Sequence, residues 1–159
     1  MQFPPLGNAV ALISDAACNE LIDEGVSVLN YRIWRRNGEY FLSLRVLTDH
    51  ALSNDYIMVL HMADVDDASE AFVNLDFAPC PPTTDWSPME AVTVVRQLVC
   101  PAVIEFRPEK AVNCVRRSAL PAGRYAIWVG LWDLEKGLSG RLARLGLVVL
   151  PNSLGTTQN

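Results

Sequence analysis

Residues 26–47 read VSVLNYRIWRRNGEYFLSLRVL. Apolar and polar side chains alternate on both sides of Asn37-Gly38, as in strands whose successive side chains point to opposite faces. Asn-Gly favours a type I′ turn, because both central residues of that turn need a positive φ. The stretch therefore predicts an antiparallel hairpin with strands over 26–34 and 40–47.

More strand-like segments follow, separated by turn residues. Their connections are mostly too short for the crossover of a dozen or more residues that parallel strands need, which leaves a sandwich or a barrel. We expect an all-β fold, an antiparallel immunoglobulin-like β-sandwich of seven to eight strands. The further segments cover 55–63, 70–77, 91–99, 102–107, 124–133 and 141–150. Residues 112–120 fit either a strand or a helical turn.

The residues before the hairpin have a different character. The segment from Asp15 to Glu24 is acidic overall, its residues are tolerated in helices, and Gly25 follows it. We therefore expect a short helix or turn there. A length of 159 residues suits one domain with its own core. We therefore expect an N-terminal extension over 1–25, a β-sandwich domain over 26–150 and a C-terminal tail over 151–159.

Composition limits the function classes. Half of the residues are apolar and 19% are charged, which excludes intrinsic disorder, and the net charge of −5 opposes nucleic-acid binding. The N-terminus lacks a secretory pattern, and no apolar stretch approaches the roughly 20 residues of a membrane-spanning helix. We expect a soluble chain without a direct membrane span, cytoplasmic or peripheral to a membrane complex by default, and extracytoplasmic if it is a fragment of a membrane protein.

The four cysteines form no Cys-x-x-Cys unit. Without a secretory signal we expect reduced thiols, with some of them buried as small apolar side chains. Cys80, in the Pro-Cys-Pro-Pro loop over 79–82, is expected to be the most exposed.

The segment 124–133, RYAIWVGLWD, separates into two faces. Tyr125 begins an alternating apolar series that suits a sandwich core. Trp128 and Trp132 share the opposite face, about 13 Å apart at a rise of about 3.3 Å per residue. Gly130, between them, leaves a packing slot or a close approach. If this face is covered, the indoles belong to the core. If it is exposed, they form an apolar patch that binds a saccharide or a protein partner. We group Trp128 and Trp132 with Arg124 as candidate binding residues.

From the hairpin onward the chain resembles the β-sandwich domain at the C-terminus of some bacterial membrane glycosyltransferases. The similar motifs are DYIMVLHMAD (55–64), PPTTDWSPME (81–90), LPAGRYAIWVGLWD (120–133) and GRL (140–142). Met89 stands where that family usually has glycine, and residues 91–119 are longer than its pattern. The resemblance implies a β-sandwich with an accessory role, since the chemistry of those transferases resides in their membrane part. It also implies that Trp86 plugs one end of the sandwich.

His61 and Asp64, followed by Asp66 and Asp67, raise the question of a metal site or acid-base chemistry. The ligand spacings of zinc and blue-copper sites are missing, so we expect no metal and no cofactor. His61 shares a strand face with Ile57 and Val59, which favours a structural histidine hydrogen-bonded within the sandwich. The aspartates are expected in a solvated hairpin loop, with weak calcium binding as the alternative.

No Gly-x-Ser-x-Gly elbow or phosphate-binding loop is present, so we expect no enzyme. Arginine exceeds lysine by 11 to 2, and protein interfaces are enriched in arginine and depleted in lysine. The leading hypothesis is a non-catalytic interaction module, an accessory or assembly subunit of a larger complex, membrane-associated or soluble. Carbohydrate binding through the two tryptophans is second, and a small hydrolase or metal protein is third.

Overall fold

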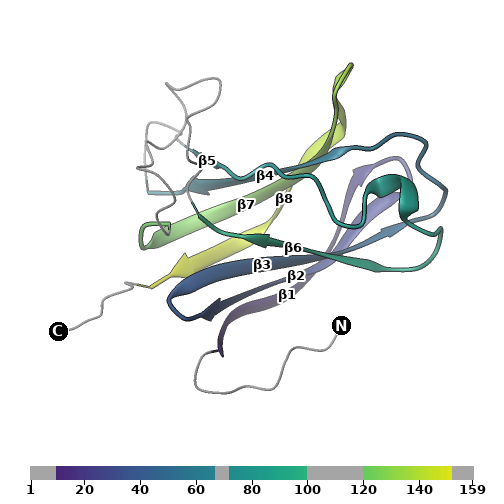
Figure 1. Cartoon of the computed structure of the whole chain (residues 1–159). Helices are drawn as coiled ribbons and strands as arrows, with labels where there is room; N and C mark the ends of the chain where they lie inside the picture. The colour runs from purple at the N-terminus through teal and green to yellow at the C-terminus, as the bar shows by residue number, and fades with distance from the viewer. Residues whose placement is uncertain (1–9, 67–71, 100–119, 152–159) are drawn as a thin grey trace.

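The computed structural model describes residues 10–66, 72–99 and 120–151, and these form an antiparallel β-sandwich (Figure 1). Two four-stranded sheets pack face to face, with strand orders β1-β2-β3-β6 and β5-β4-β7-β8. The all-β sandwich expected from the sequence is confirmed. The strands are β1 (Val10–Asp23), β2 (Val26–Arg36), β3 (Glu39–Thr48), β4 (Ile57–Asp64), β5 (Phe72–Asn74), β6 (Val92–Gln97), β7 (Gly123–Asp133) and β8 (Gly137–Leu150), and a 3-10 turn, η1, spans Thr83–Asp85.

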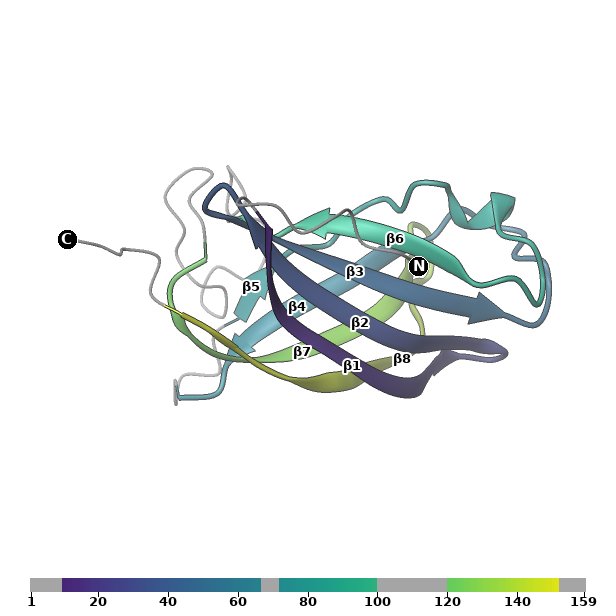
Figure 2. The ribbon, with the colours of Figure 1, turned by 90° about the horizontal axis from the view of Figure 1, so that it is seen from below.

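The first sheet is built around the predicted hairpin (Figure 2). β2 and β3 pair antiparallel, and their last pair, Arg36 with Glu39, encloses the Asn-Gly turn. Asn37 and Gly38 have φ values of 53° and 80°, as a type I′ turn requires. β6 then adds to the free side of β3. The hairpin prediction is confirmed, and its strands run one or two residues longer than the pattern indicated.

The prediction of a short helix or turn over Asp15–Glu24 is wrong. Val10–Asp23 form β1, which pairs antiparallel with β2 along its whole length, and Gly25 lies in the tight turn that joins them. The segment that we separated from the sandwich therefore contributes a strand to it. β1 lies at the sheet edge, and six of its 14 residues are exposed, whereas only Ile22 is buried.

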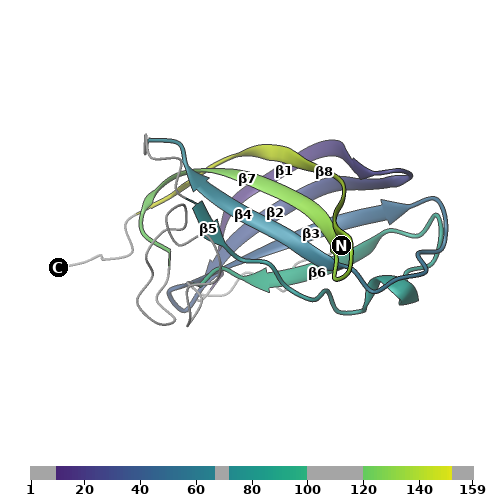
Figure 3. The same cartoon turned by 90° about the horizontal axis from the view of Figure 1, so that it is seen from above.

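The second sheet contains the motifs at 55–64 and 120–133 as adjacent strands (Figure 3). β4 and β7 pair antiparallel from Ile57 opposite Trp132 to Asp64 opposite Tyr125. β8 follows on the other side of β7 and begins at Gly137, four residues earlier than predicted. β5 is a short edge strand of three residues. The strand expected over 102–107 and the undecided segment before Leu120 lie outside the described residues.

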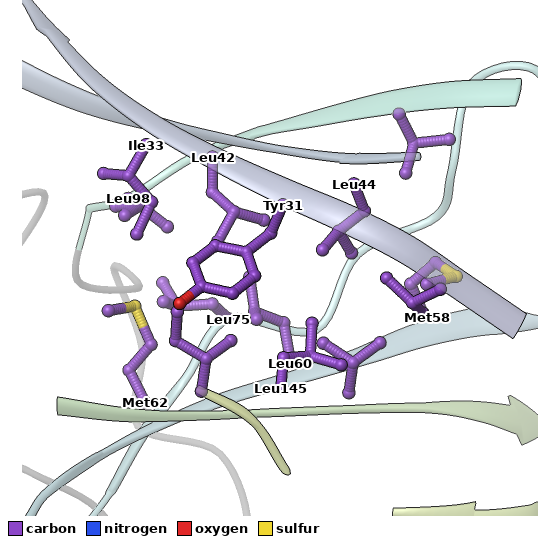
Figure 4. Packing of buried hydrophobic residues seen from close by; sticks show 14 of the residues in the cluster. Tyr31, Ile33, Leu42, Leu44, Met58, Leu60, Met62, Leu75, Leu98 and Leu145 are labelled. Atoms are coloured by element: carbon purple, nitrogen blue, oxygen red, sulfur yellow. The ribbon is translucent and has the colours of Figure 1, made fainter. Parts of the chain in front are cut away.

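Alternate residues of both sheets form one apolar core (Figure 4). Tyr31, Leu42 and Leu44 enter it from the first sheet. Leu60 and Met62 enter from β4, and neither exposes any surface. Each such side chain contributes about 1.5–3 kcal/mol through its removal from water.

The strands β1 and β8 close one side of the sandwich, where both views of the ribbon place them side by side (Figures 2 and 3). The Arg141 guanidinium donates from Nε to the Leu21 carbonyl oxygen at 2.8 Å, and Ser139 Oγ donates to Asp23 Oδ2 at 2.6 Å. The contact passes over Gly140, whose φ is 79°. A Cβ at this position would collide with the Ile22 carbonyl oxygen and lie 2.8 Å from Asp23 Cα.

Candidate functional site

The outer face of the second sheet is the candidate site, because it gathers large apolar side chains on three neighbouring strands. Figure 3 shows these strands, β4, β7 and β8, side by side. The register places Trp132 between Ile57 on β4 and Leu138 on β8. The row through Trp128 consists of His61, Trp128 and Arg144. We call the following residues the apolar face: Ile57, Val59, Ala126, Trp128, Trp132, Leu138, Leu142, Leu147 and Val149.

Much of the apolar face is open to solvent. Trp132 is 41% exposed, Leu138 44% and Val149 57%, whereas Trp128 is only partly exposed. The smaller members Val59 and Ala126 are buried. The sequence left open whether the tryptophans are covered; among the described residues, nothing covers Trp132 fully.

The outer face of the first sheet has a different chemistry. Its central rows carry polar side chains on β1, β2 and β3, including Asp15, Arg32 and Arg45. An antiparallel sandwich commonly leaves such polar faces to water. The first sheet also has an apolar row of Leu12, Trp34 and Phe41 near its hairpin turn. The second sheet differs because the exposed Trp132 and Leu138 are cross-strand neighbours on its outer face, and contiguous exposed apolar surface marks interaction sites.

The β7–β8 turn positions Trp132 and Leu138. Asp133 Oδ1 accepts hydrogen bonds from the backbone N–H groups of Glu135 and Lys136, at 2.8 and 3.1 Å, and these bonds lower the pKa of Asp133. Asn54 Nδ2 donates to its other oxygen at 3.1 Å. A Cβ built on Gly137 would lie 3.7 Å from the Trp132 indole, so the ring lies over this glycine.

Gly130 lies between the two tryptophans and beneath two leucines. A Cβ there would be 3.2 Å from Leu138 Cδ1 and 3.3 Å from Leu142 Cδ1. Both leucine side chains therefore lie over the glycine on the outer face. The absence of a side chain lets the leucines of β8 cover the space between the indoles, which joins Trp128 and Trp132 into one apolar surface.

His61 borders the apolar face. Its ring stacks on Phe72, with centroids 4.3 Å apart, and its Nε2 lies 3.4 Å from Asp76 Oδ1. The face that it shares with Ile57 and Val59 is the outer face of the sheet, opposite the core. His61 thus contacts the edge strand β5 across the sheet surface.

Arg124 and Asp64 lie at the far end of the sheet from Trp132. Arg124 Nε is 3.3 Å from Asp66 Oδ2 in the loop after β4, and both side chains are more than half exposed. Asp64 Oδ1 accepts a hydrogen bond from the Asp66 N–H at 2.9 Å. The register separates Arg124 from Trp132 by the length of β7, so the structure does not bring Arg124 together with the exposed indole.

Tyr125 and Trp86 belong to the core. The Tyr125 hydroxyl donates to the Pro121 carbonyl oxygen at 2.8 Å, and burial, with a smaller contribution from the Asp64 charge, raises the pKa of Tyr125 to about 12. Trp86, 3% exposed, donates from Nε1 to the Pro81 carbonyl oxygen at 2.9 Å. Nearby Met89 has a φ of 66°.

Two cysteines are described, and both are free thiols. Cys80 is exposed in its proline-rich loop. Cys18 is partly buried on β1, its Sγ lies 3.4 Å from the Val28 carbonyl oxygen, and burial raises the pKa of its thiol. Cys100 and Cys114 lie outside the described residues.

Sequence reasoning missed the contribution of β8 to the site. Leu138, Leu147 and Val149 face outward beside the tryptophan strand, and each is more than two-fifths exposed. The available signal was the run LGLVVL over 145–150, which is apolar at consecutive positions and so cannot place all its apolar side chains in one core.

Within the ranges that the structure describes, no three histidine, cysteine or acidic side chains gather as metal ligands. No helix in those ranges has the length and apolar character needed to cross a bilayer. No protein-family model, curated protein or solved structure matches the chain.

Proposed function

We propose that this protein is a non-catalytic β-sandwich interaction module that docks onto another protein through the apolar face. Its expected place is as an accessory or assembly subunit of a larger, membrane-associated complex. The observation that carries the proposal is the pair of Trp132 and Leu138 on adjacent strands, 41% and 44% exposed. At the other end of β8, beyond Arg144, Leu147 and Val149 add further exposed apolar surface. Burial of such a surface by a partner is favourable at about 25 cal/mol per Å² before the costs of association.

The surroundings of Trp132 favour a protein over a saccharide. Its cross-strand neighbours, Ile57 and Leu138, are aliphatic and offer a sugar no hydroxyl-binding groups. A protein partner needs an apolar centre with a polar rim. Arg144, exposed in the Trp128 row, supplies a cation beside the apolar side chains. We therefore infer a partner surface that is apolar at its centre and acidic opposite Arg144.

Strand order supports the immunoglobulin-like assignment within this proposal. If β2, β3 and β6 are equated with strands A, B and E, then β5, β4, β7 and β8 follow as C′, C, F and G. The Tyr125 bond to Pro121, four residues upstream at the start of β7, has the form of the tyrosine corner of that fold. β1 is an additional strand outside A.

Two features support the resemblance to the accessory domain of membrane glycosyltransferases. Met89 replaces the family's glycine and has a φ of 66°, in the left-handed region that glycine favours. Gly140, in the motif at 140–142, has a φ of 79°, in the same region. At both positions the backbone conformation favours glycine, which is consistent with a glycine in the family's motif.

The proposal is tested by the size of the native assembly. The tagged chain is expressed at its natural level in its source organism and compared with two variants, Leu138→Asp and Val95→Asp. Leu138 and Val95 are 44% and 49% exposed on the outer faces of opposite sheets, so each variant adds one charge to a comparable position. Gel filtration with light scattering then reports the mass of each assembly.

We expect the wild-type chain and Val95→Asp to elute in a complex well above the 17.6 kDa of the chain, and Leu138→Asp to elute alone. A wild-type chain that elutes at its own mass would contradict the proposal. If Leu138→Asp still elutes in the complex, the apolar face is not the surface through which the chain docks. A third outcome would favour the carbohydrate hypothesis over protein docking: the chain has no protein partner, it binds a saccharide, and Trp132→Ala abolishes that binding.

A further inference from the structure

A polar depression lies on the outer face of the first sheet, on the opposite side of the sandwich from the apolar face. It has a volume of about 130 Å³, room for several water molecules, and it spans three strands. The residues that line it all have polar side chains, and they are Asn30, Arg32, Ser43, Arg45 and Thr93.

The strand register explains the hollow. Arg45 lies between Asn30 on β2 and Thr93 on β6, and in the next row Ser43 is opposite Arg32. Opposed residues in adjacent strands have Cα atoms about 4.5–5.5 Å apart, so longer side chains normally fill the space between rows. Ser43 is 4% exposed and too short to do so, and it forms the floor between two arginines.

The lining groups share one chemistry, because all of them carry hydrogen-bond donors. Two guanidinium groups, one amide and two hydroxyls surround the depression, and none of its lining side chains is a carboxylate. Arg32 and Arg45 occupy diagonal positions on β2 and β3, where like charges repel. An anion between them would relieve that repulsion and accept hydrogen bonds from both guanidinium groups.

The charges close to the depression leave one arginine available. Asp15 on β1 pairs with Arg32, with 2.7 Å between Asp15 Oδ2 and Arg32 Nη2. Arg45 is exposed and has no ion-pair partner among the described residues. Among the described residues at the depression, the charges of Arg32, Arg45 and Asp15 sum to +1, on a chain whose net charge is −5.

We propose that this depression binds one small oxyanion, a carboxylate, sulfate or phosphate group, with the Arg45 guanidinium as its principal contact. Ser43 and Thr93 hydroxyls donate from the floor and the β6 side, and Arg32 supports the site from β2. The planar donor pair of a guanidinium matches the paired oxygens of all three groups. The inference does not depend on the apolar face, which lies on the other sheet.

The test is a titration of the full ¹⁵N-labelled chain followed by NMR. Sodium acetate, sodium sulfate and methyl phosphate are the three probes, each added at constant ionic strength against sodium chloride. Arg45→Gln removes the proposed contact, and Thr93→Val removes a hydroxyl without a change of shape. Arg144→Gln is the control, because it removes one exposed arginine from the opposite outer face.

We expect at least one probe to give saturable shifts at the Arg45 Nε–H and at the amides of Ser43 and Thr93. Arg45→Gln should weaken binding at least about tenfold and Thr93→Val by a few-fold, while Arg144→Gln leaves it unchanged. The relative affinities of the three probes show whether a carboxylate, a sulfate or a phosphate fits the depression best. Shifts that do not saturate, or equal weakening by Arg45→Gln and Arg144→Gln, would overturn the proposal by showing only general charge attraction.

Discussion

The Tyr125 hydroxyl donates a hydrogen bond to the backbone carbonyl oxygen of Pro121, 2.8 Å away, and ties the start of β7 to the chain that enters it. The tyrosine is 2% exposed, so the bond satisfies a buried hydroxyl. β7 carries Trp128 and Trp132 on its other face, and the corner therefore supports the strand on which the candidate site is built.

Tyr125→Phe should lower the free energy of unfolding by about 1 kcal/mol at neutral pH, the usual contribution of such a hydrogen bond. Urea unfolding followed by tryptophan fluorescence measures the difference. Because the ring and its packing stay, a loss as large as that of a core cavity, about 3 kcal/mol or more, would contradict this account of the bond.

The same tyrosine predicts a specific pH dependence. Its pKa is raised to about 12 in the folded chain, against about 10 when unfolded. Between these values the unfolded chain releases a proton that the folded chain retains, so this contribution to stability is complete below about pH 10 and is lost towards pH 12. The wild-type chain should lose more stability across that window than Tyr125→Phe. If the free energies of unfolding of the two chains fall in parallel across this pH range, burial does not raise the pKa of Tyr125.

Met89→Gly should stabilise the protein by about 1 kcal/mol, because Met89 has a φ of 66° and its side chain, in a residue 67% exposed, contributes little packing. Thermal unfolding measures the gain. Met89→Ala is the control, since alanine has the same backbone strain as methionine and should give no comparable gain. Destabilisation by the glycine would mean that the methionine side chain has a role of its own.

Gly140→Ala should destabilise the sandwich more than Gly38→Ala. Both glycines have positive φ values, 79° and 80°, so both variants share a backbone cost of about 1 kcal/mol. Only Gly140 faces backbone atoms of Ile22 and Asp23, whereas a Cβ on Gly38 meets nothing within 4 Å. Equal losses in chemical denaturation would contradict the close crossing of β1 and β8.

The hairpin and the alternation of β7 could be predicted because their signals are local. Asn37-Gly38 specifies its turn without reference to the rest of the chain, and the period of two separates Tyr125 from Trp128. β1 was missed for a local reason as well. It is an edge strand whose acidic residues, such as Asp15 and Glu20, interrupt the apolar alternation and resemble a helix composition.

The apolar face could be predicted only in part, because it depends on which strands are neighbours. The sequence places Trp128 and Trp132 on one face of one strand, but it does not say that Leu138 lies opposite Trp132. The polar depression has the same origin. Its floor, Ser43, becomes significant only when β2 and β6 place Arg32 and Thr93 around it.

The most direct measurement of the central claim is photo-crosslinking in the source organism. A benzophenone amino acid replaces either Leu138 on the apolar face or Val95 on the opposite sheet, in otherwise identical chains. The account predicts one defined protein crosslinked from position 138, lost when Trp132→Asp is added, and absent from position 95. Equal crosslinking from both positions, none from either, or only a product of two copies of this chain would contradict docking of another protein on the apolar face.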